Sequence, residues 1–266
     1  MKQSSTNEAS SRSFARFLQL SEAPVIIALP CALGAAAFFQ LNNAALLTFV
    51  VALAALGVLF AGYESSRPAL RQIMPCVVLG ALAAAGRVVF ALVPYVKPVS
   101  AICILSGVVF GRRSGFMVGA LAAFVSNFFF GQGPWTPWQM YAWGLVGYLA
   151  GVFADAGLFG LLAPTDVSSS CQSSSQLPPS QKTTSFKLRR AMLYVYGFLS
   201  GLLYGFLLNT WTLVGFVQPI TWESALMIYG AGLPFDCVHA VATVAFLVII
   251  YEPWRRKLFR IKQKYQ

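Results

Sequence analysis

Long apolar runs alternate with short polar or Gly/Pro-containing breaks along the whole chain. Most of these runs have the length and composition of a membrane-crossing helix. The pattern predicts eight such helices, with ends uncertain by a few residues, at 24–40, 44–62, 72–94, 98–110, 114–130, 137–162, 189–214 and 224–252.

The fourth segment, 98–110, is short for a membrane crossing. Its length as a helix is about 20 Å, against a hydrocarbon core of about 30 Å. The alternative is a re-entrant hairpin over 98–130, which would carry Arg112 and Arg113 to the bilayer centre at roughly 2.5 kcal/mol or more each. A short helix with extended ends costs less, so eight crossings are expected.

Composition supports an all-α polytopic membrane protein. Hydrophobic residues make up 58% of the 266 positions, charged residues 10%, and the mean hydropathy is +0.68. Residues 1–22 are polar and contain no cleavable apolar core, so the first apolar segment is expected to remain as an anchor. The five cysteines show no zinc or disulfide spacing. No cofactor or metal site is expected.

Charge sets the expected topology. An even number of crossings puts both termini on one side, and if that side is the cytoplasm, 17 of the 19 Lys and Arg lie inside. Most of the net charge of +11 is then explained by the orientation of the chain in the membrane, and nucleic acid is not expected as a partner. The Ser-rich stretch from Pro164 to Leu188 is interpreted as a disordered cytoplasmic linker between a six-helix and a two-helix part.

The stretch Ser126–Gln139 (SNFFFGQGPWTPWQ) is the most distinctive, and it opens to the predicted outside. It combines side-chain amides with indole and phenyl rings and has no charge. This composition suits a wall that stacks on, and hydrogen-bonds to, a small neutral or weakly charged molecule. The alternative is an interfacial aromatic belt.

Small residues recur every three to four positions on several helices and favour close packing in lipid. Four of these stripes end, toward the predicted outer side, at Arg87, Ser126, Asn209 and Asp236. Such an arrangement predicts an outward-facing cavity. Arg87 and Asp236 can pair, either as a structural salt bridge or around a ligand. His239 beside a single Asp makes a poor metal site.

Neither a Walker motif nor a Gly-x-Ser-x-Gly elbow is present, so the chain is not expected to be an enzyme or to hydrolyse ATP itself. An importer would then need an energy source from a partner.

Four segments together resemble the substrate-binding subunits (S components) of energy-coupling factor (ECF) transporters, which are bacterial vitamin importers. They are Gly86–Phe90 (GRVVF), Lys97–Gly111, Val125–Met140 and Gly232–Ala240 (GLPFDCVHA). The resemblance implies a six-helix binding core at 71–252, containing the linker 163–188. It leaves a polar N-terminus at 1–22, two additional helices at 23–63, and a basic cytoplasmic tail at 253–266.

The resemblance also implies a location in the bacterial cell membrane and assembly with a membrane coupling subunit and two cytoplasmic ATPases. Ala81 and Ala85 match the Ala-x-x-x-Ala pattern through which such subunits commonly dock. It suggests a vitamin as substrate, with a cobalamin-like compound as the first candidate and another vitamin or a modified base as alternatives. The expected substrate-binding residues are Arg87, Asn127, Gln132, Trp135, Trp138, Gln139, Asn209, Trp211 and Asp236.

Two other classes of function stay open from the residues alone. A self-sufficient secondary transporter would use Arg87 and Asp236 as an ion relay. An intramembrane enzyme would use Asp236 and His239 as acid and base.

Overall fold

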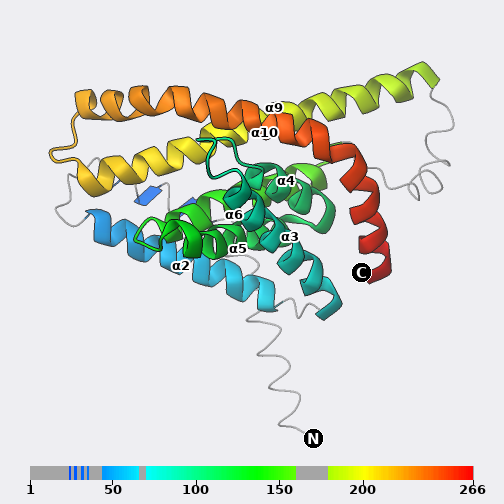
Figure 1. The fold of residues 1–266 in the computed structure, drawn as a ribbon, viewed down its shortest axis with the longest axis horizontal. Helices are drawn as coiled ribbons and strands as arrows, with labels where there is room; N and C mark the ends of the chain where they lie inside the picture. The colour runs from blue at the N-terminus through cyan, green and yellow to red at the C-terminus, as the bar shows by residue number, and fades with distance from the viewer. Residues whose placement is uncertain are drawn as a thin grey trace, which may run out of the picture.

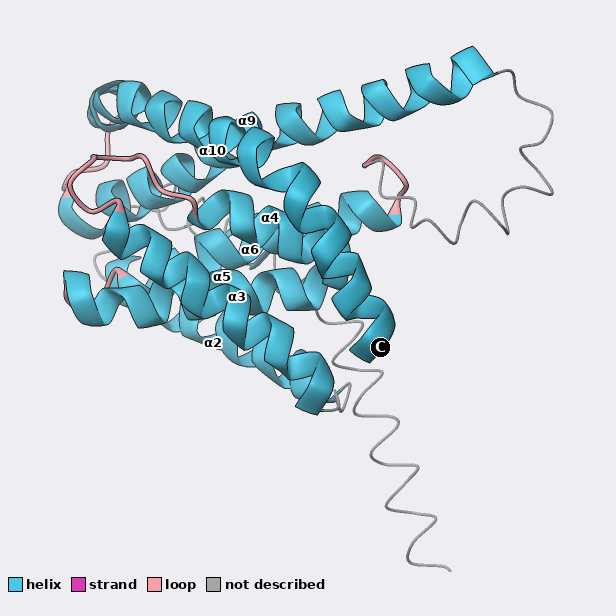
Figure 2. Cartoon of the chain, turned by 45° about the vertical axis from the view of Figure 1, so that its right-hand side comes forward, coloured by secondary structure: helices cyan, strands magenta, loops and turns pink. Residues whose placement is uncertain are grey.

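The computed structural model of the chain describes residues 44–65, 70–159 and 179–265, together with isolated positions between 24 and 35. Every regular element in these ranges is a helix, which confirms the all-α prediction (Figure 2). The helices are α2 (Ala44–Ser65), α3 (Leu70–Val89), α4 (Val99–Phe110), α5 (Arg112–Phe130), α6 (Thr136–Asp155), α9 (Pro179–Phe216) and α10 (Trp222–Tyr265). The predicted first segment, 24–40, lies largely outside the described residues.

The short helix α4 is the centre of the bundle. All twelve of its residues are buried, and α5, α6 and α10 pack around it. A helix that is apolar on every side is either buried in protein or exposed to lipid, and α4 is buried in protein. Its shortness therefore reflects its position inside the protein.

Glycines let α5 and α6 approach closely, and these two helices form the most extensive contact in the fold. A Cβ atom on Gly147 would lie 2.2 Å from the carbonyl oxygen of Gly115, and one on Gly115 would lie 2.4 Å from that of Gly147. No other residue fits at either position without moving the backbone. The predicted small-residue stripes on these helices are packing surfaces.

Helix α6 ends earlier than predicted, at Asp155. Gly157 adopts a left-handed conformation (φ 75°), and the Leu158 amide donates to the Phe153 carbonyl at 3.0 Å. These features form a glycine C-cap, which stops the helix although the following residues are apolar.

Helices α9 and α10 form a long antiparallel pair along one side of the bundle (Figure 1). Both are longer than predicted. Helix α9 begins at Pro179, inside the stretch interpreted as a disordered linker, because proline is well suited to the first turn of a helix. Helix α10 continues through the predicted basic tail to Tyr265 and bends in its C-terminal third (Figure 1).

The connections α3–α4, α5–α6 and α9–α10 lie at one end of the bundle, here called the loop end (Figure 2). The opposite end, here called the C-terminal end, carries the start of α3 and the end of α10. Three helical stretches are long and apolar enough to cross a bilayer: Arg112–Phe130, Lys187–Phe216 and Trp222–Lys264. Many large apolar side chains on α3, α9 and α10 are exposed. The protein is a helical membrane protein whose apolar surface faces lipid.

Candidate binding site

A cavity of about 350 Å³ lies toward the loop end, between α3, α6, α9 and α10. The α3–α4 connection also contributes to its wall. The lining combines two cationic side chains, one carboxylate, two amides and several rings. The lining residues are Arg87, Tyr95, Lys97, Gln139, Trp143, Tyr204, Gly205, Leu208, Asn209, Asp236 and His239.

Arg87 reaches into this cavity from the last turn of α3. Its guanidinium donates to Ser126 Oγ at 2.7 Å and to Asn127 Oδ1 at 2.6 Å, and it lies 4.9 Å from the ring centroid of Trp143. No ion pair joins Arg87 to Asp236, both of which lie in the described part of the chain. Arg87 is held by neutral groups and an aromatic face, so its charge is not cancelled by the protein.

Asn127 links Arg87 to the α5–α6 connection. Its side chain is fully buried, and its Nδ2 donates to Gln139 Oε1 at 2.9 Å and to Thr136 Oγ1 at 3.0 Å. Thr136 in turn donates to Gln132 Oε1, and Gln132 donates to the Phe124 carbonyl, both at 2.9 Å. Most of the amides in Ser126–Gln139 therefore bond to one another and fix the connection. Of these amides, only Gln139 lines the cavity.

Asn209 and Asp236 face each other across α9 and α10, with Asn209 Nδ2 donating to Asp236 Oδ2 at 2.9 Å. A glycine one turn away on each helix makes room for the polar side chain of the other helix. A Cβ on Gly205 would lie 2.0 Å from Asp236 Oδ1, and a Cβ on Gly232 would lie 2.4 Å from Asn209 Nδ2. The pattern Gly-x-x-x-Asn on α9 thus interlocks with Gly-x-x-x-Asp on α10.

His239 joins α10 to the α3–α4 side of the cavity. Its Nδ1 lies 3.0 Å from the Tyr95 carbonyl oxygen, and its Nε2 lies 3.0 Å from Ser100 Oγ. Since a carbonyl only accepts, the assigned tautomer carries the proton on Nδ1, and Nε2 accepts from the Ser100 hydroxyl. Both ring nitrogens are therefore occupied by protein partners.

The α3–α4 connection closes over the cavity with Tyr95 and Lys97. Tyr95 has a left-handed backbone (φ 60°), and its ring stacks on Phe235 at 4.7 Å between centroids. The Lys97 ammonium donates to the carbonyls of Phe90 and of Val93. Partial burial and the nearby Arg87 guanidinium lower the pKa of Lys97. The α3–α4 connection is therefore held by side chains that bond to its backbone carbonyls, whereas the α5–α6 connection is held by bonds between side chains.

Trp143 and Tyr204 form an aromatic wall. Their rings stack at 4.6 Å between centroids, 20° from parallel. Together with Arg87 they offer flat surfaces beside the polar groups of Gln139 and Asp236. Such a combination suits a planar, polar ligand.

The structure brings four of the nine predicted binding residues to this cavity: Arg87, Gln139, Asn209 and Asp236. Asn127 is hydrogen-bonded to two of these residues, Arg87 and Gln139. The remaining four point elsewhere. Trp138 is 1% exposed and packs in a cluster with α2, and Trp211 lines a separate apolar groove with Leu46 and Phe49. Trp135 packs on Gly133, and Gln132 lies within the exposed connection.

Sequence reasoning missed several lining residues, two of which share a helix face with predicted ones. Trp143 is one turn after Gln139, and His239 is one turn after Asp236. For these two residues the signal was the helical repeat around the predicted polar residue. Tyr204 and Leu208 lie on a neighbouring face of α9, each directly before a lining residue, Gly205 and Asn209, and the repeat does not point to them. Ala81 and Ala85, the predicted docking residues, are both exposed on α3.

Comparisons with known proteins bear on α3–α6. The family of the ECF-type riboflavin transporter S component matches residues 69–159, a stretch that contains these four helices and the Arg87, Gln139 and Trp143 side of the cavity. Searches of curated proteins and of solved structures found no match. Over residues 69–159 the family match confirms the resemblance to S components of energy-coupling factor transporters that the sequence predicted.

Proposed function

We propose that this chain is the substrate-specific membrane subunit of an ECF-type vitamin importer, and that the cavity at the loop end is its substrate site. The observation that carries the proposal is the convergence of Arg87, Gln139, Asn209 and Asp236, from four different helices, on one cavity with an aromatic wall. Ionisable groups at membrane depth are expensive, and they are usually retained for function.

In this proposal the loop end faces outward and both termini are cytoplasmic, as the distribution of Lys and Arg favours. Ligand enters beside the α3–α4 connection. The coupling subunit contacts the exposed face of α3 at Ala81 and Ala85, and two cytoplasmic ATPases supply the energy.

The cavity favours a vitamin of the size of riboflavin. A volume of about 350 Å³ is at the lower end of the range for small-molecule sites. A cobalamin-like compound is several times larger and would require the walls to open. The flavin ring is planar, which suits Trp143. Its pyrimidine edge carries carbonyls that can accept from Arg87 and an N–H that can donate to Asp236.

Two observations weigh against the rival functions. An ion relay needs Arg87 and Asp236 to exchange protons or ions, yet each is bonded to neutral side chains. The enzyme alternative needs Asp236 and His239 to act together as acid and base, yet Asp236 bonds to Asn209 while His239 bonds to Ser100 and to the Tyr95 carbonyl.

The test is ligand binding by the purified full-length protein. Native mass spectrometry of protein isolated from its own host should show a bound small molecule and co-purifying ATPase subunits. Titration with riboflavin, cobalamin and their precursors, followed by Trp fluorescence, should then reveal one tight ligand. Uptake in vesicles that requires an ion gradient and no ATPase partner would contradict the proposal.

A further inference from the structure

A second cavity lies at the opposite, C-terminal end of the bundle, between α3 and the last turns of α10. Its volume is about 440 Å³, comparable to one acyl chain, and nearly all of its lining surface is apolar. The lining residues are Leu70, Met74, Pro75, Val78, Leu79, Leu258 and Ile261. Leu70, Met74 and Val78 are 80%, 65% and 60% exposed, so the groove is open to the surroundings of α3.

The segment of α10 beside this groove is amphipathic. Residues Pro253–Tyr265 contain six Lys or Arg and no Asp or Glu. Leu258 is buried, and Trp254, Phe259 and Ile261 pack against the core of the bundle. A segment with this many cations cannot lie in hydrocarbon, while its apolar side is already engaged with transmembrane helices. It therefore lies at the membrane interface.

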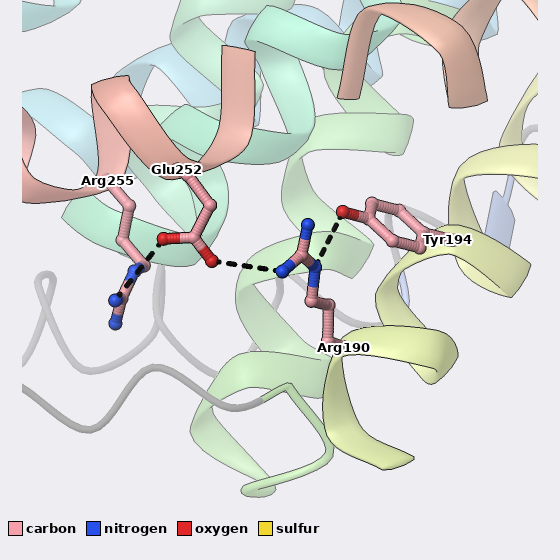
Figure 3. Close-up of polar contacts among 4 residues, drawn as sticks. All are labelled: Arg190, Tyr194, Glu252 and Arg255. Atoms are coloured by element: carbon pink, nitrogen blue, oxygen red, sulfur yellow. Dashed lines mark hydrogen bonds and ion pairs between the residues drawn. The ribbon is translucent and has the colours of Figure 1, made fainter. Parts of the chain in front are cut away.

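Contacts with α9 fix this segment in place (Figure 3). Glu252 accepts from Arg190 of α9 at 3.3 Å and pairs with Arg255 at 3.6 Å, and Arg190 Nε also donates to Tyr194 Oη at 2.8 Å. Pro253 follows Glu252 inside the helix, where proline favours a bend. Glu252 is thus occupied by two arginines, and Asp155 lies near the segment at a separate cavity lined by Phe259 and Lys262.

Two lysines flank the groove. Lys257 lies four residues before Ile261 and Lys264 three residues after it, so both neighbour this groove residue on the helix surface. Both are exposed. An apolar slot at lipid depth is thereby bordered, at the interface, by positive charge.

We propose that this groove is a binding site for an anionic phospholipid, with one acyl chain in the slot and the headgroup at Lys257 and Lys264. Apolar area retains the chain, and cations at the level of the headgroups select negative over zwitterionic lipid. The inference does not depend on the identity of the transported substrate.

Native mass spectrometry of the full-length protein tests this site, with phosphatidylglycerol and phosphatidylcholine of identical chains as the probes. The wild-type protein should retain phosphatidylglycerol preferentially. In the Lys257→Gln/Lys264→Gln variant the preference should fall roughly tenfold. The matched control, Arg256→Gln/Lys262→Gln, removes the same charge from other faces of the same segment and should keep the preference.

A groove-filling variant tests the acyl-chain position separately. Val78→Trp, at an exposed position, should reduce binding of both lipids while the helical circular dichroism stays unchanged. Equal binding of the two lipids by the wild type, or an equal loss in both double variants, would overturn the proposal. So would quantitative cross-linking of Met74→Cys to a coupling subunit that leaves no lipid bound, because the groove would then be a protein interface.

Discussion

Asn209 on α9 donates a hydrogen bond to Asp236 on α10 at 2.9 Å, and each lies one helical turn from the glycine that accommodates the other. Asp236 accepts this bond with one carboxyl oxygen and also lines the cavity. Four residues of two helices therefore fix the geometry of one side of the candidate site.

Replacing Gly232 with alanine should destabilise the protein by about 1–3 kcal/mol, because the new Cβ would overlap Asn209. The matched control is Gly230→Ala on the same helix, where nothing lies within 4 Å. There alanine should be neutral or stabilising by up to about 1 kcal/mol through its higher helix propensity. Thermal unfolding in detergent checks both, and equal melting temperatures for the two variants would contradict the interlock.

Asp236→Asn should fold as well as the wild type but bind ligand more weakly, by roughly ten- to a hundredfold. The new amide can still accept from Asn209, whereas the charge that strengthens a bond from a ligand N–H is lost. Titration calorimetry and thermal unfolding together separate the two effects. An unchanged affinity would remove Asp236 from the ligand contacts.

Arg87→Ala should lower stability even without ligand, by about 1–3 kcal/mol. The substitution leaves the buried Asn127 Oδ1 without its donor. Lysine at this position is a partial rescue, since it restores the charge but cannot reach both Ser126 and Asn127 in the same geometry. Stability that is unchanged while binding is lost would make Arg87 purely a ligand contact.

Trp143→Leu should reduce ligand affinity at least tenfold, whereas Trp211→Leu should leave affinity within about twofold. Trp143 lines the cavity and Trp211 lines the apolar groove beside α2. Fluorescence quenching on ligand addition should likewise vanish in the Trp143 variant and persist in the Trp211 variant. The reverse pattern would support the binding residues expected from the sequence over those seen in this cavity.

His239→Ala should accelerate ligand release. His239 is the α10 side chain that holds the Tyr95 carbonyl, and without it the left-handed Tyr95 loses a bond that keeps the α3–α4 connection closed. Stopped-flow dissociation measures the rate, with Val238→Ala, an exposed neighbour, as control. An unchanged rate would show that this connection is not the gate.

Most of the helices were predictable because long apolar runs in a membrane protein have few alternatives. The errors lie at ends set by local structure. Gly157 caps α6 early, and Pro179 starts α9 within a polar stretch. Apolarity does not mark either position.

The polar half of the site was predictable and the aromatic half was not. An ionisable or amide side chain at membrane depth has few acceptable surroundings, so Arg87, Asn209 and Asp236 could be predicted to face the protein. A tryptophan is stable against lipid, in a core or in a cavity. Trp138 and Gln139 are adjacent on α6 and point about 100° apart around its axis. Which of them faces the cavity depends on the rotation of α6 about that axis, and composition does not fix this rotation.

One helix, Trp222–Tyr265, carries Asp236 in its first half and the basic segment Pro253–Tyr265 at its other end. Its 44 residues correspond to roughly 66 Å of helix at 1.5 Å per residue, about twice the thickness of the hydrocarbon core, with a bend in the C-terminal third (Figure 1). A rigid-body tilt of α10 on filling of the cavity would therefore also move Lys257 and Lys264 relative to the membrane surface. Such a movement would transmit the occupancy of the cavity to the C-terminal end of the bundle without the movement of a loop.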